Sequence, residues 1–447
     1  MDRISELPDS LILHILSRLS PKEVKATSVL SKTWLRITDS ITLDLCFNDS
    51  RIPRADFPSF VHRVLCRGHT NLRSVTLHLN FVYDADQTQH WIKAMEARNV
   101  KEVNLFLRHC YVLVPELFVC KTVEVLHVSC SVHIKLPPLI RLPSLKILNL
   151  ILEDIDFSIG VTVAKLISGC PELEELNLMF GVSPCKGILL IQSSRLKKFE
   201  LRFCSVGHNP TSIGELRLDT PALEFLDVSF LYAVPQVYLI SRMPSLCDIK
   251  IAVSLQEEQV LDNSVHARVG FIREVDYIKA LSLCSTTLKI LNLGPMAALP
   301  LFPNLTRLEV GLVEKFEPCM RLLEHMPNLE ELVLQMVQWS LKAWKMAQPD
   351  GVPPQCLLKS LRTVEFNNFR GSKSEMKMAK YFLRHGGALE IMKISLYKSR
   401  GRRSATRGIR FADFGYIMDR NLNVDSIRQN LAMAPSASVA RELIIIP

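Results

Sequence analysis

The sequence predicts an α/β fold in which many short strands stack into one long parallel sheet, behind a small helical segment at the start of the chain. Three observations lead to this prediction. A six-residue apolar pattern recurs between residues 72 and 394, apolar residues at helical spacing fill several of the gaps between its copies, and residues 1–45 show helical spacing without the repeat. Length alone, 447 residues, would suggest about three domains. The repeat replaces that estimate with one array.

Each copy of the pattern has an apolar residue, two polar residues, an apolar residue, one polar residue and a last apolar residue. Thirteen copies occur, beginning at residues 72, 100, 123, 145, 173, 196, 223, 246, 288, 305, 329, 361 and 389. The first seven spacings run from 22 to 28 residues, which lies within the roughly 20–29 residue period of leucine-rich repeats. The number of copies, rather than any single one, makes this signal specific.

The last two apolar residues of each copy lie two apart, so they share one face of a short strand. No single copy can bury that face alone, and stacking the copies gives one continuous core. Segments 158–170 and 316–327 have apolar residues at helical spacing and should cover the core face. We therefore predict a curved solenoid with a parallel sheet inside and helices and loops outside.

The array is irregular after residue 251. The spacing from the copy at 246 to the copy at 288 is 42 residues, and the next is only 17. We expect segment 252–287 to be an insertion that adds a loop and a helix. The alternative is an insertion that contacts a ligand, since long loops on solenoids often lie on a binding face. A small-molecule receptor would be the corresponding function.

Residues 1–45 predict three short helices. Pro21 lies near the start of the second helix, where proline is tolerated, and Trp34 closes the third apolar patch. A segment this short buries too little surface to be very stable alone, so it should dock on the repeats, on a partner, or on both. The apolar face of the first helix comprises Leu11, Ile12, Ile15, Leu16 and Leu19.

This segment resembles the F-box of plant proteins. Residues 2–19 read DRISELPDSLILHILSRL and residues 27–34 read TSVLSKTW, which follow the family's two motifs. The chain departs from them at Leu19-Ser20-Pro21, where proline falls one place late, and it lacks the second tryptophan often found near Trp34. The resemblance implies a face that docks on a Skp-type adaptor, formed by Leu7, Pro8, Leu11, Ile15, Leu16, Leu19, Val29, Leu30 and Trp34. A helical cap for the repeats is the structural alternative.

Residues 352–396 resemble the FBD domain that accompanies an F-box and leucine-rich repeats in one plant family. The matching pieces include Cys356-Leu357-Leu358, Thr363-Val364-Glu365 and Ala379-Lys380-Tyr381, and residues 431–446 resemble the family's terminal segment. A helix with Met376, Ala379, Lys380 and Leu383 on one face should end at Gly386-Gly387. We expect four regions: F-box 1–45, leucine-rich repeats 46–350, FBD continuing the solenoid 351–397, and a basic loop with the terminal segment 398–447.

Composition agrees with an ordinary globular protein, at 48% hydrophobic and 22% charged residues. The formal net charge is +9, and segment 398–410 carries six of these charges with no acidic residue, which leaves 9 − 6 = +3 elsewhere. We expect that segment to be a solvated loop, with a nuclear-localisation or nucleic-acid patch as the alternative. No apolar run approaches a membrane span, and MDRISELPDS is no secretory leader. The predicted location is cytoplasmic or nuclear, without membrane or nucleic-acid partners.

Chemistry-bearing motifs are absent from the sequence. The twelve cysteines include no CxxC pair, and the twelve histidines lack metal-ligand spacing, so we expect reduced thiols, no metal and no cofactor. No phosphate-binding loop or nucleophile elbow occurs, and we predict no catalytic residue. The resemblance implies the substrate-recognition subunit of an SCF-type cullin–RING ubiquitin ligase, with the adaptor linking to the cullin and RING protein. Its target cannot be named from the sequence. The alternative is a leucine-rich scaffold without ubiquitin transfer.

Overall fold

A computed structural model describes residues 4, 7–16, 18–19, 21–40, 43–66, 71–108, 115–130, 139–154, 159–182, 187–204, 214–231, 234–255, 269–293, 299–312, 316–336, 352–397, 424–433 and 442–446. The chain divides into two compact units, Met1–Ser245 and Leu246–Pro447. Segments 256–268 and 398–410, for which the sequence raised functional alternatives, lie outside the described residues.

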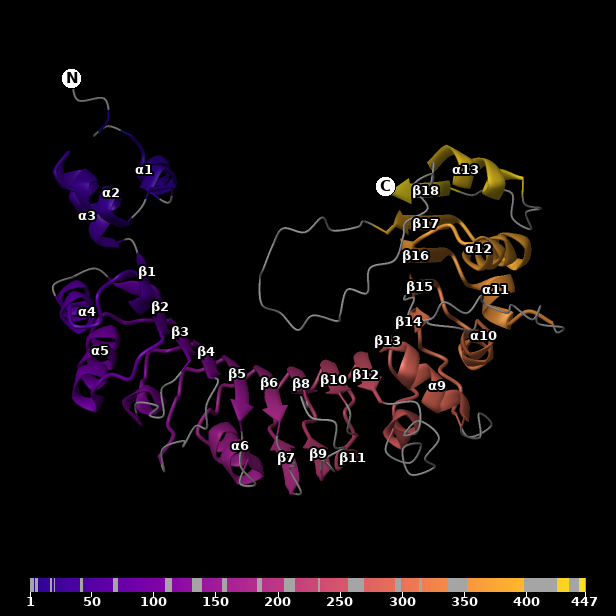
Figure 1. Cartoon of the computed structure of the whole chain (residues 1–447), viewed down its shortest axis with the longest axis horizontal. Coiled ribbons are helices and arrows are strands. Elements are labelled where there is room, and N and C mark those ends of the chain that lie inside the picture. Colours follow the sequence, from indigo (N-terminus) through magenta and orange to yellow (C-terminus); the bar gives the residue numbers. More distant parts are fainter. Residues whose placement is uncertain are drawn as a thin grey trace. The chain divides into compact units, whose positions relative to one another are not determined.

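Three short helices open the first unit: α1 (Asp9–Leu16), α2 (Pro21–Thr27) and α3 (Lys32–Ser40) (Figure 1). Their shared core consists of Ile12, Leu16, Val24, Trp34 and Ile37. Leu43, the first residue of strand β1, packs against this core, so the helices are joined to the sheet by apolar contact as well as by the chain. The predicted three-helix segment is therefore present.

Parallel strands build the main sheet of the first unit, and each except β1 contains one copy of the repeat. In the part of the unit that the structure describes, they pair in the order β1 (Leu43–Asn48), β2 (Leu72–Leu79), β3 (Glu102–Leu107), β4 (Val125–Cys130), β5 (Ile147–Asp154), β6 (Glu175–Val182), β8 (Lys198–Cys204) and β10 (Phe225–Leu231). Burial alternates along strands such as β2, β3 and β4, so the repeat's apolar residues form the core and the residues between them lie on the open face.

Helices and a second small sheet cover the core face of the main sheet (Figure 1). The helical elements are η1 (Asp49–Arg51), α4 (Phe57–Cys66), α5 (Ala85–Ala97), η2 (Pro115–Val119) and α6 (Ile159–Ser168). Helix α6 was predicted, and Val163, Leu166 and Ile167 are buried as its spacing requires. The small sheet, in the order β11 (Gln236–Leu239), β9 (Glu215–Asp219) and β7 (Ile188–Gln192), was not predicted.

The second unit repeats the same construction. Its strands pair in parallel in the order β12 (Asp248–Ser254), β13 (Ala280–Leu283), β14 (Arg307–Leu312), β15 (Glu331–Met336), β16 (Thr363–Phe369), β17 (Ile391–Leu396) and β18 (Glu442–Ile446). The helical elements are η3 (Gly270–Glu274), α9 (Ser285–Leu293), α10 (Glu317–Leu323), α11 (Gln355–Lys359), α12 (Lys373–His385) and α13 (Val424–Ala432). Helix α12 ends at Gly386 as predicted, although Met378 and Phe382 are buried rather than Met376 and Lys380.

One predicted copy of the repeat is wrong. Residues 288–293 lie in α9, and the strand at this place is β13, whose segment 278–283, IKALSL, fits the same pattern. The misassignment has a physical reason, because Leu288 and Leu291 are three apart and suit a helix as well as a strand. With the corrected copy the spacings become 278 − 246 = 32 and 305 − 278 = 27, so segment 252–287 holds a regular repeat strand. The other twelve predicted copies each lie on a strand.

Candidate functional site

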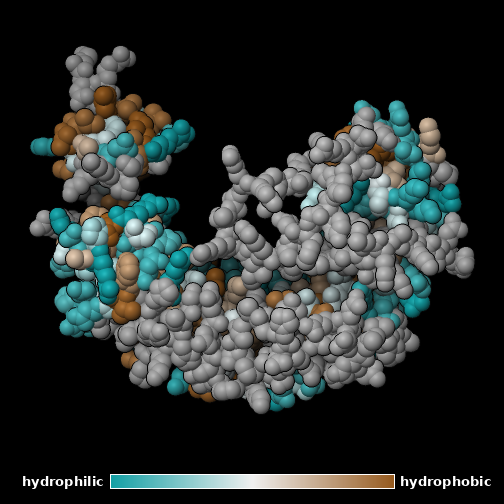
Figure 2. Space-filling model, viewed as in Figure 1, coloured by the Kyte–Doolittle hydropathy of each residue, from teal (hydrophilic) through white to brown (hydrophobic). Residues whose placement is uncertain are grey.

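The first candidate site is an apolar surface on α1–α3. Figure 2 shows hydrophobic side chains over these helices. Among the described residues from α1 to α3, the exposed large apolar side chains are Leu11, Leu13 and Ile15 of α1, Val29 and Leu30 between α2 and α3, and Leu35 of α3. A cluster of this kind on a small folded unit marks a site of association, because apolar side chains gain free energy when a partner removes them from water. We call these six residues the F-box surface cluster.

The structure divides the nine predicted docking residues into two groups. Pro8, Leu11, Ile15, Val29 and Leu30 are exposed, while Leu7 and Leu19 are half-buried against the helical core. Leu16 and Trp34 have only 1% and 3% of their surface exposed. While the segment is folded, these two side chains shape the core and cannot be presented to a partner.

Sequence reasoning missed Leu13 of α1 and Leu35 of α3, which are exposed on the same helices as predicted docking residues. A signal for Leu13 existed, because five of the eight positions of α1, from Asp9 to Leu16, are apolar. Only Ile12 and Leu16 of these are buried. A helix that is apolar around most of its circumference must present apolar side chains on a second face.

Polar contacts hold the three helices in place around this cluster. The Trp34 Nε1 group donates to the Ile4 carbonyl oxygen at 3.1 Å, which ties the segment before α1 to α3. Arg36 of α3 and Asp9 of α1 form an exposed ion pair at 2.8 Å. Because the ion pair is exposed, its contribution to stability is small, and it mainly fixes the relative orientation of the two helices.

The second candidate site is the open face of the main sheet in the first unit. One row of side chains occupies the same register on successive strands, and we call it the polar row. It consists of Thr76, Asn104, His127, Asn149, Asn177, Glu200 and Asp227. Parallel strands in register place equivalent residues about 4.8 Å apart, so this row is a continuous line of hydrogen-bonding groups from β2 to β10.

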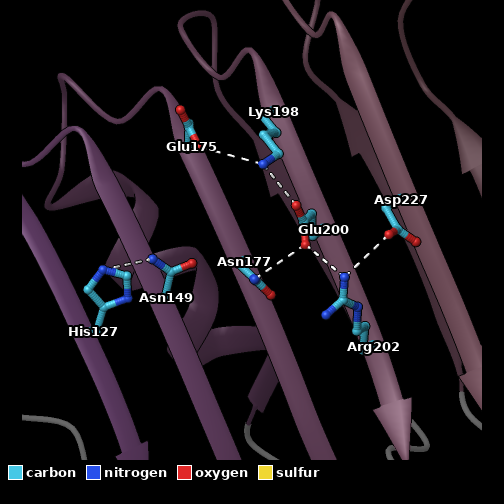
Figure 3. Close-up of polar contacts among 8 residues, drawn as sticks. All are labelled: His127, Asn149, Glu175, Asn177, Lys198, Glu200, Arg202 and Asp227. Carbon is cyan, nitrogen blue, oxygen red and sulfur yellow. Dashed lines mark hydrogen bonds and ion pairs between the residues drawn. The ribbon is translucent and has the colours of Figure 1, made fainter. Parts of the chain in front are cut away.

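Charged groups are concentrated at the β6–β10 end of this row (Figure 3). Glu200 accepts from Asn177 Nδ2 at 3.3 Å and pairs with Lys198 at 2.9 Å. Arg202 lies between two carboxylates, 3.1 Å from Glu200 and 3.4 Å from Asp227. The Asp227 carboxylate is almost fully buried and also accepts from the Ser229 hydroxyl at 3.1 Å. The charges at this end therefore satisfy one another.

The middle of the row carries amides and an imidazole instead. Asn149 Nδ2 lies 3.5 Å from His127 Nε2, and Asn104 Nδ2 donates to Glu102 at 2.8 Å. Partial burial lowers the pKa of His127, and nearby Glu102 offsets only part of this effect. The imidazole is therefore neutral at physiological pH. Hydrogen bonding, without net charge, is what this stretch of the open face offers a ligand.

The remaining chemistry-bearing residues of the described chain are thiols and isolated titratable groups. Burial raises the pKa of Cys170, Cys319 and Cys356 to about 12, so these thiols stay protonated. In the described ranges, no three His, Cys, Asp or Glu side chains gather as they would around a metal ion. Among the helices described there, none is both long and apolar enough to cross a membrane.

Family profiles match three parts of the chain. Residues 4–45 match the F-box domain, residues 88–263 match the LRR repeats of FBD-associated F-box protein At5g56370, and residues 348–394 match the FBD domain. The chain is thus an F-box protein with leucine-rich repeats and an FBD domain, which agrees with the helices and parallel strands already described. This composition confirms the predicted fold class and supports a substrate-adaptor role.

Similar proteins occur in Arabidopsis thaliana. F-box protein At3g59000 is 30% identical, with 88% of this chain and 86% of that protein covered. F-box/FBD/LRR-repeat protein At5g53840 is 28% identical, covering 99% and 95%, and F-box/LRR-repeat protein At3g59190 is 30% identical, covering 75% and 93%. The chain belongs to the plant F-box/FBD/LRR-repeat family, as the sequence motifs predicted.

Proposed function

We propose that the protein is the substrate-recognition subunit of an SCF-type cullin–RING ubiquitin ligase. In this role the F-box docks on a Skp-type adaptor, which links it to the cullin and the RING protein, and the repeats hold a target protein. The F-box surface cluster is the observation that carries the proposal, since a folded three-helix unit with six exposed apolar side chains needs a partner to cover them. These partners would place the protein in the cytoplasm or nucleus.

The proposed mechanism is positioning rather than bond making. The F-box fixes the protein to the ligase, and the open face of the sheet holds the target so that its lysines stay close to the charged ubiquitin-conjugating enzyme. Holding two reactants together raises their effective concentration and removes much of the entropic cost of their encounter. The chain itself would need no catalytic group, cofactor or metal for this task.

Substitutions on the F-box surface cluster test the docking face. Leu11→Asp combined with Val29→Asp should reduce capture of a co-expressed Skp-type adaptor by about tenfold or more, because both side chains are exposed and a carboxylate in an apolar interface is costly to desolvate. Val161→Asp, at an equally exposed apolar residue of α6, is the matched control and should leave capture unchanged. Thermal unfolding followed by circular dichroism should be the same for all three proteins.

Core substitutions separate docking from folding. Leu16→Ala and Trp34→Ala should unfold the helical segment, because buried side chains of this size stabilise a domain by about 2–5 kcal/mol. Their loss of capture should therefore accompany loss of helical signal. Capture that survives Leu11→Asp with Val29→Asp would contradict the docking face, and an intact wild-type chain that captures no adaptor would favour the leucine-rich scaffold.

A further inference from the structure

A second row of side chains lies next to the polar row on the open face, two residues further along each strand. It consists of Phe106, Ser129, Ile151 and Met179 on β3 to β6, and we call it the apolar row. Phe106 is 41% exposed and Ile151 is 38% exposed. The His78 ring of β2 stacks on Phe106 with ring centroids 4.6 Å apart, which fixes the orientation of the phenyl ring. Rigid, exposed apolar side chains are typical anchors in binding sites.

The adjacent part of the polar row has unused hydrogen-bonding capacity. In the described part of the chain, the side-chain hydrogen bonds of Asn104, Asn149 and Asn177 all use Nδ2. Their side-chain amide oxygens (Oδ1) accept none. An asparagine side chain can donate two hydrogen bonds and accept two. Amide groups spaced along a line match the alternating N–H and C=O groups of another protein's backbone. They are a weaker match for a phosphate, which prefers charged donors.

The charges of this face also favour a polypeptide over a nucleic acid. Lys198 and Arg202 are the cations that the described residues of β3–β10 present here, and both are paired with Glu200. His127 is neutral because burial lowers its pKa. A nucleic acid would have to draw these cations away from their carboxylates and would meet Glu102 and Glu175 as repelling charges. An uncharged segment meets neither cost.

We propose that strands β3–β8 bind an extended segment of the target protein, uncharged over its central residues. Its apolar side chains cover Phe106 and Ile151, and its backbone hydrogen-bonds the polar row between Asn104 and Asn177. From β3 to β8 the sheet spans about 19 Å, four strand spacings, which an extended chain of about six residues covers. That the bound protein is the ligase target rests on the proposed function, whereas the binding chemistry rests on the open face alone.

A random twelve-residue peptide library displayed on phage and selected on the immobilised full-length protein tests this site. The enriched peptides should share a stretch of about six residues that is rich in apolar residues and poor in charged ones. Enrichment of Lys- and Arg-rich peptides, or of Asp- and Glu-rich ones, would overturn the proposal, because charge would then dominate recognition. A selection that enriches nothing would overturn it as well.

Calorimetric titration of one enriched peptide then locates the site. Ile151→Glu should weaken binding by about tenfold or more, and Asn149→Ala by several-fold, with unchanged circular dichroism. Ile188→Glu is the matched control, because Ile188 is a similarly exposed isoleucine on β7, outside the main sheet, and it should have no effect. Unchanged affinity in the Ile151→Glu protein would refute the site.

Adaptor capture by the same proteins keeps the two proposals apart. If the wild-type protein binds the peptide but captures no Skp-type adaptor, the peptide site is supported and the ligase role is contradicted. If it captures the adaptor normally but binds no peptide, the ligase role is supported and the peptide site is contradicted. Ile151→Glu should leave adaptor capture unchanged, because the residue lies on β5 rather than on the three helices.

Discussion

At the scale of single residues, close backbone contacts determine which positions tolerate a side chain. A Cβ atom added to Gly160 of α6 would lie 2.2 Å from the Ile188 carbonyl oxygen of β7. Gly160 and Ile188 belong to a helix and a strand, whose backbones cannot easily shift to make room for this atom. The absence of a side chain at Gly160 therefore allows α6 and the small sheet to lie close together. By contrast, a Cβ atom at Gly270 would meet nothing within 4 Å.

Gly160→Ala should therefore destabilise the first unit by about 1–3 kcal/mol, as expected when an atom is forced into a packed contact. Gly270→Ala, the same substitution in open space, should change the free energy of unfolding by only a few tenths of a kcal/mol. Urea unfolding followed by circular dichroism measures both. Equal midpoints for the two variants would show that α6 and β7 are not in contact as described.

The sequence could predict burial at this scale only where a repeat defines it. In the twelve copies that lie on strands, the apolar positions of the repeat were assigned to the core correctly, because many copies indicate one pattern. The burial of Asp49 could not be predicted in this way, because the residue lies outside the repeat. Its buried carboxylate accepts from the backbone N–H groups of Asn80 and Phe81 and from the Tyr83 hydroxyl. These partners lie 31 to 34 residues away along the chain, and only the fold brings them together.

Contacts between elements also explain why some predicted docking residues of the F-box are exposed and others are buried. Helical spacing grouped Leu11 and Ile15 with Leu16 because all three are apolar and lie within two turns. Which side of α1 faces the core depends on how α2 and α3 pack against it, and that arrangement is not encoded in α1 alone. The spacing thus identified the apolar residues of the candidate site without distinguishing core from surface.

At the scale of elements, alternating charges line the start of successive strands. The second residue of consecutive repeats is Lys101, Glu124, Lys146, Glu174 and Lys197. Glu124 pairs with Lys101 at 2.8 Å and with Lys146 at 3.0 Å, and Lys197 pairs with Glu174 at 2.9 Å. Backbone N–H groups at the same positions donate to the preceding repeat's carbonyl oxygens. If a repeat paired with the next but one instead of with its neighbour, like charges would lie beside each other.

This ladder predicts how stability depends on pH. Lys101 and Lys146 lower the pKa of Glu124 through hydrogen bonds and charge attraction. A carboxyl whose pKa is lower in the folded state stabilises the fold above its unfolded pKa, and that stability is lost as the pH falls through the folded value. Glu124→Gln should thus be slightly less stable than wild type at pH 7. The difference should shrink as the pH falls below about 4.3 and vanish below the folded-state pKa of Glu124.

Urea midpoints for wild type and Glu124→Gln at pH 7 and pH 3 measure this effect. High salt at pH 7 provides the control, because screening should also reduce the difference between the two proteins. A difference that persists unchanged at pH 3 would mean that Glu124 contributes by packing rather than by charge.

Strands were predictable where the repeat dominates, whereas helices such as α6 and α12 were predictable from their apolar spacing. The small sheet of β7, β9 and β11 was missed because its strands are four or five residues long and lie in the outer layer, where helices and loops were expected. The copy at 288–293 failed for the opposite reason, since its sequence fits the repeat but its backbone pairs with no strand. Strand β13 satisfies the same pattern and supplies the hydrogen bonds to β12 and β14.

At the scale of the whole molecule, a stack of repeats is stabilised by contacts between neighbours, so its ends need protection. Strand β18 is the last strand of the described sheet in the second unit. It pairs in parallel with β17 along residues Glu442 to Ile446, while Ile427 and Leu431 of α13 are buried and α13 packs on α12. Without β18, the open edge of the sheet would move inward to β17, whose Met392 and Ile394 are buried in the whole chain. A newly exposed edge of this kind promotes association with other chains.

A chain ending at Met433 should therefore associate or lose solubility. It lacks β18 but keeps α13, so the change tests the strand rather than the helix. Light scattering coupled to size-exclusion chromatography should show higher-order species, whereas adaptor capture should persist because the F-box belongs to the other compact unit. A monomeric truncated chain with the wild-type unfolding temperature would contradict a protective role for β18. In a stack stabilised by contacts between neighbouring repeats, a truncation in the second unit should leave the first unit folded. Loss of adaptor capture would therefore show that folding of the first unit depends on the second.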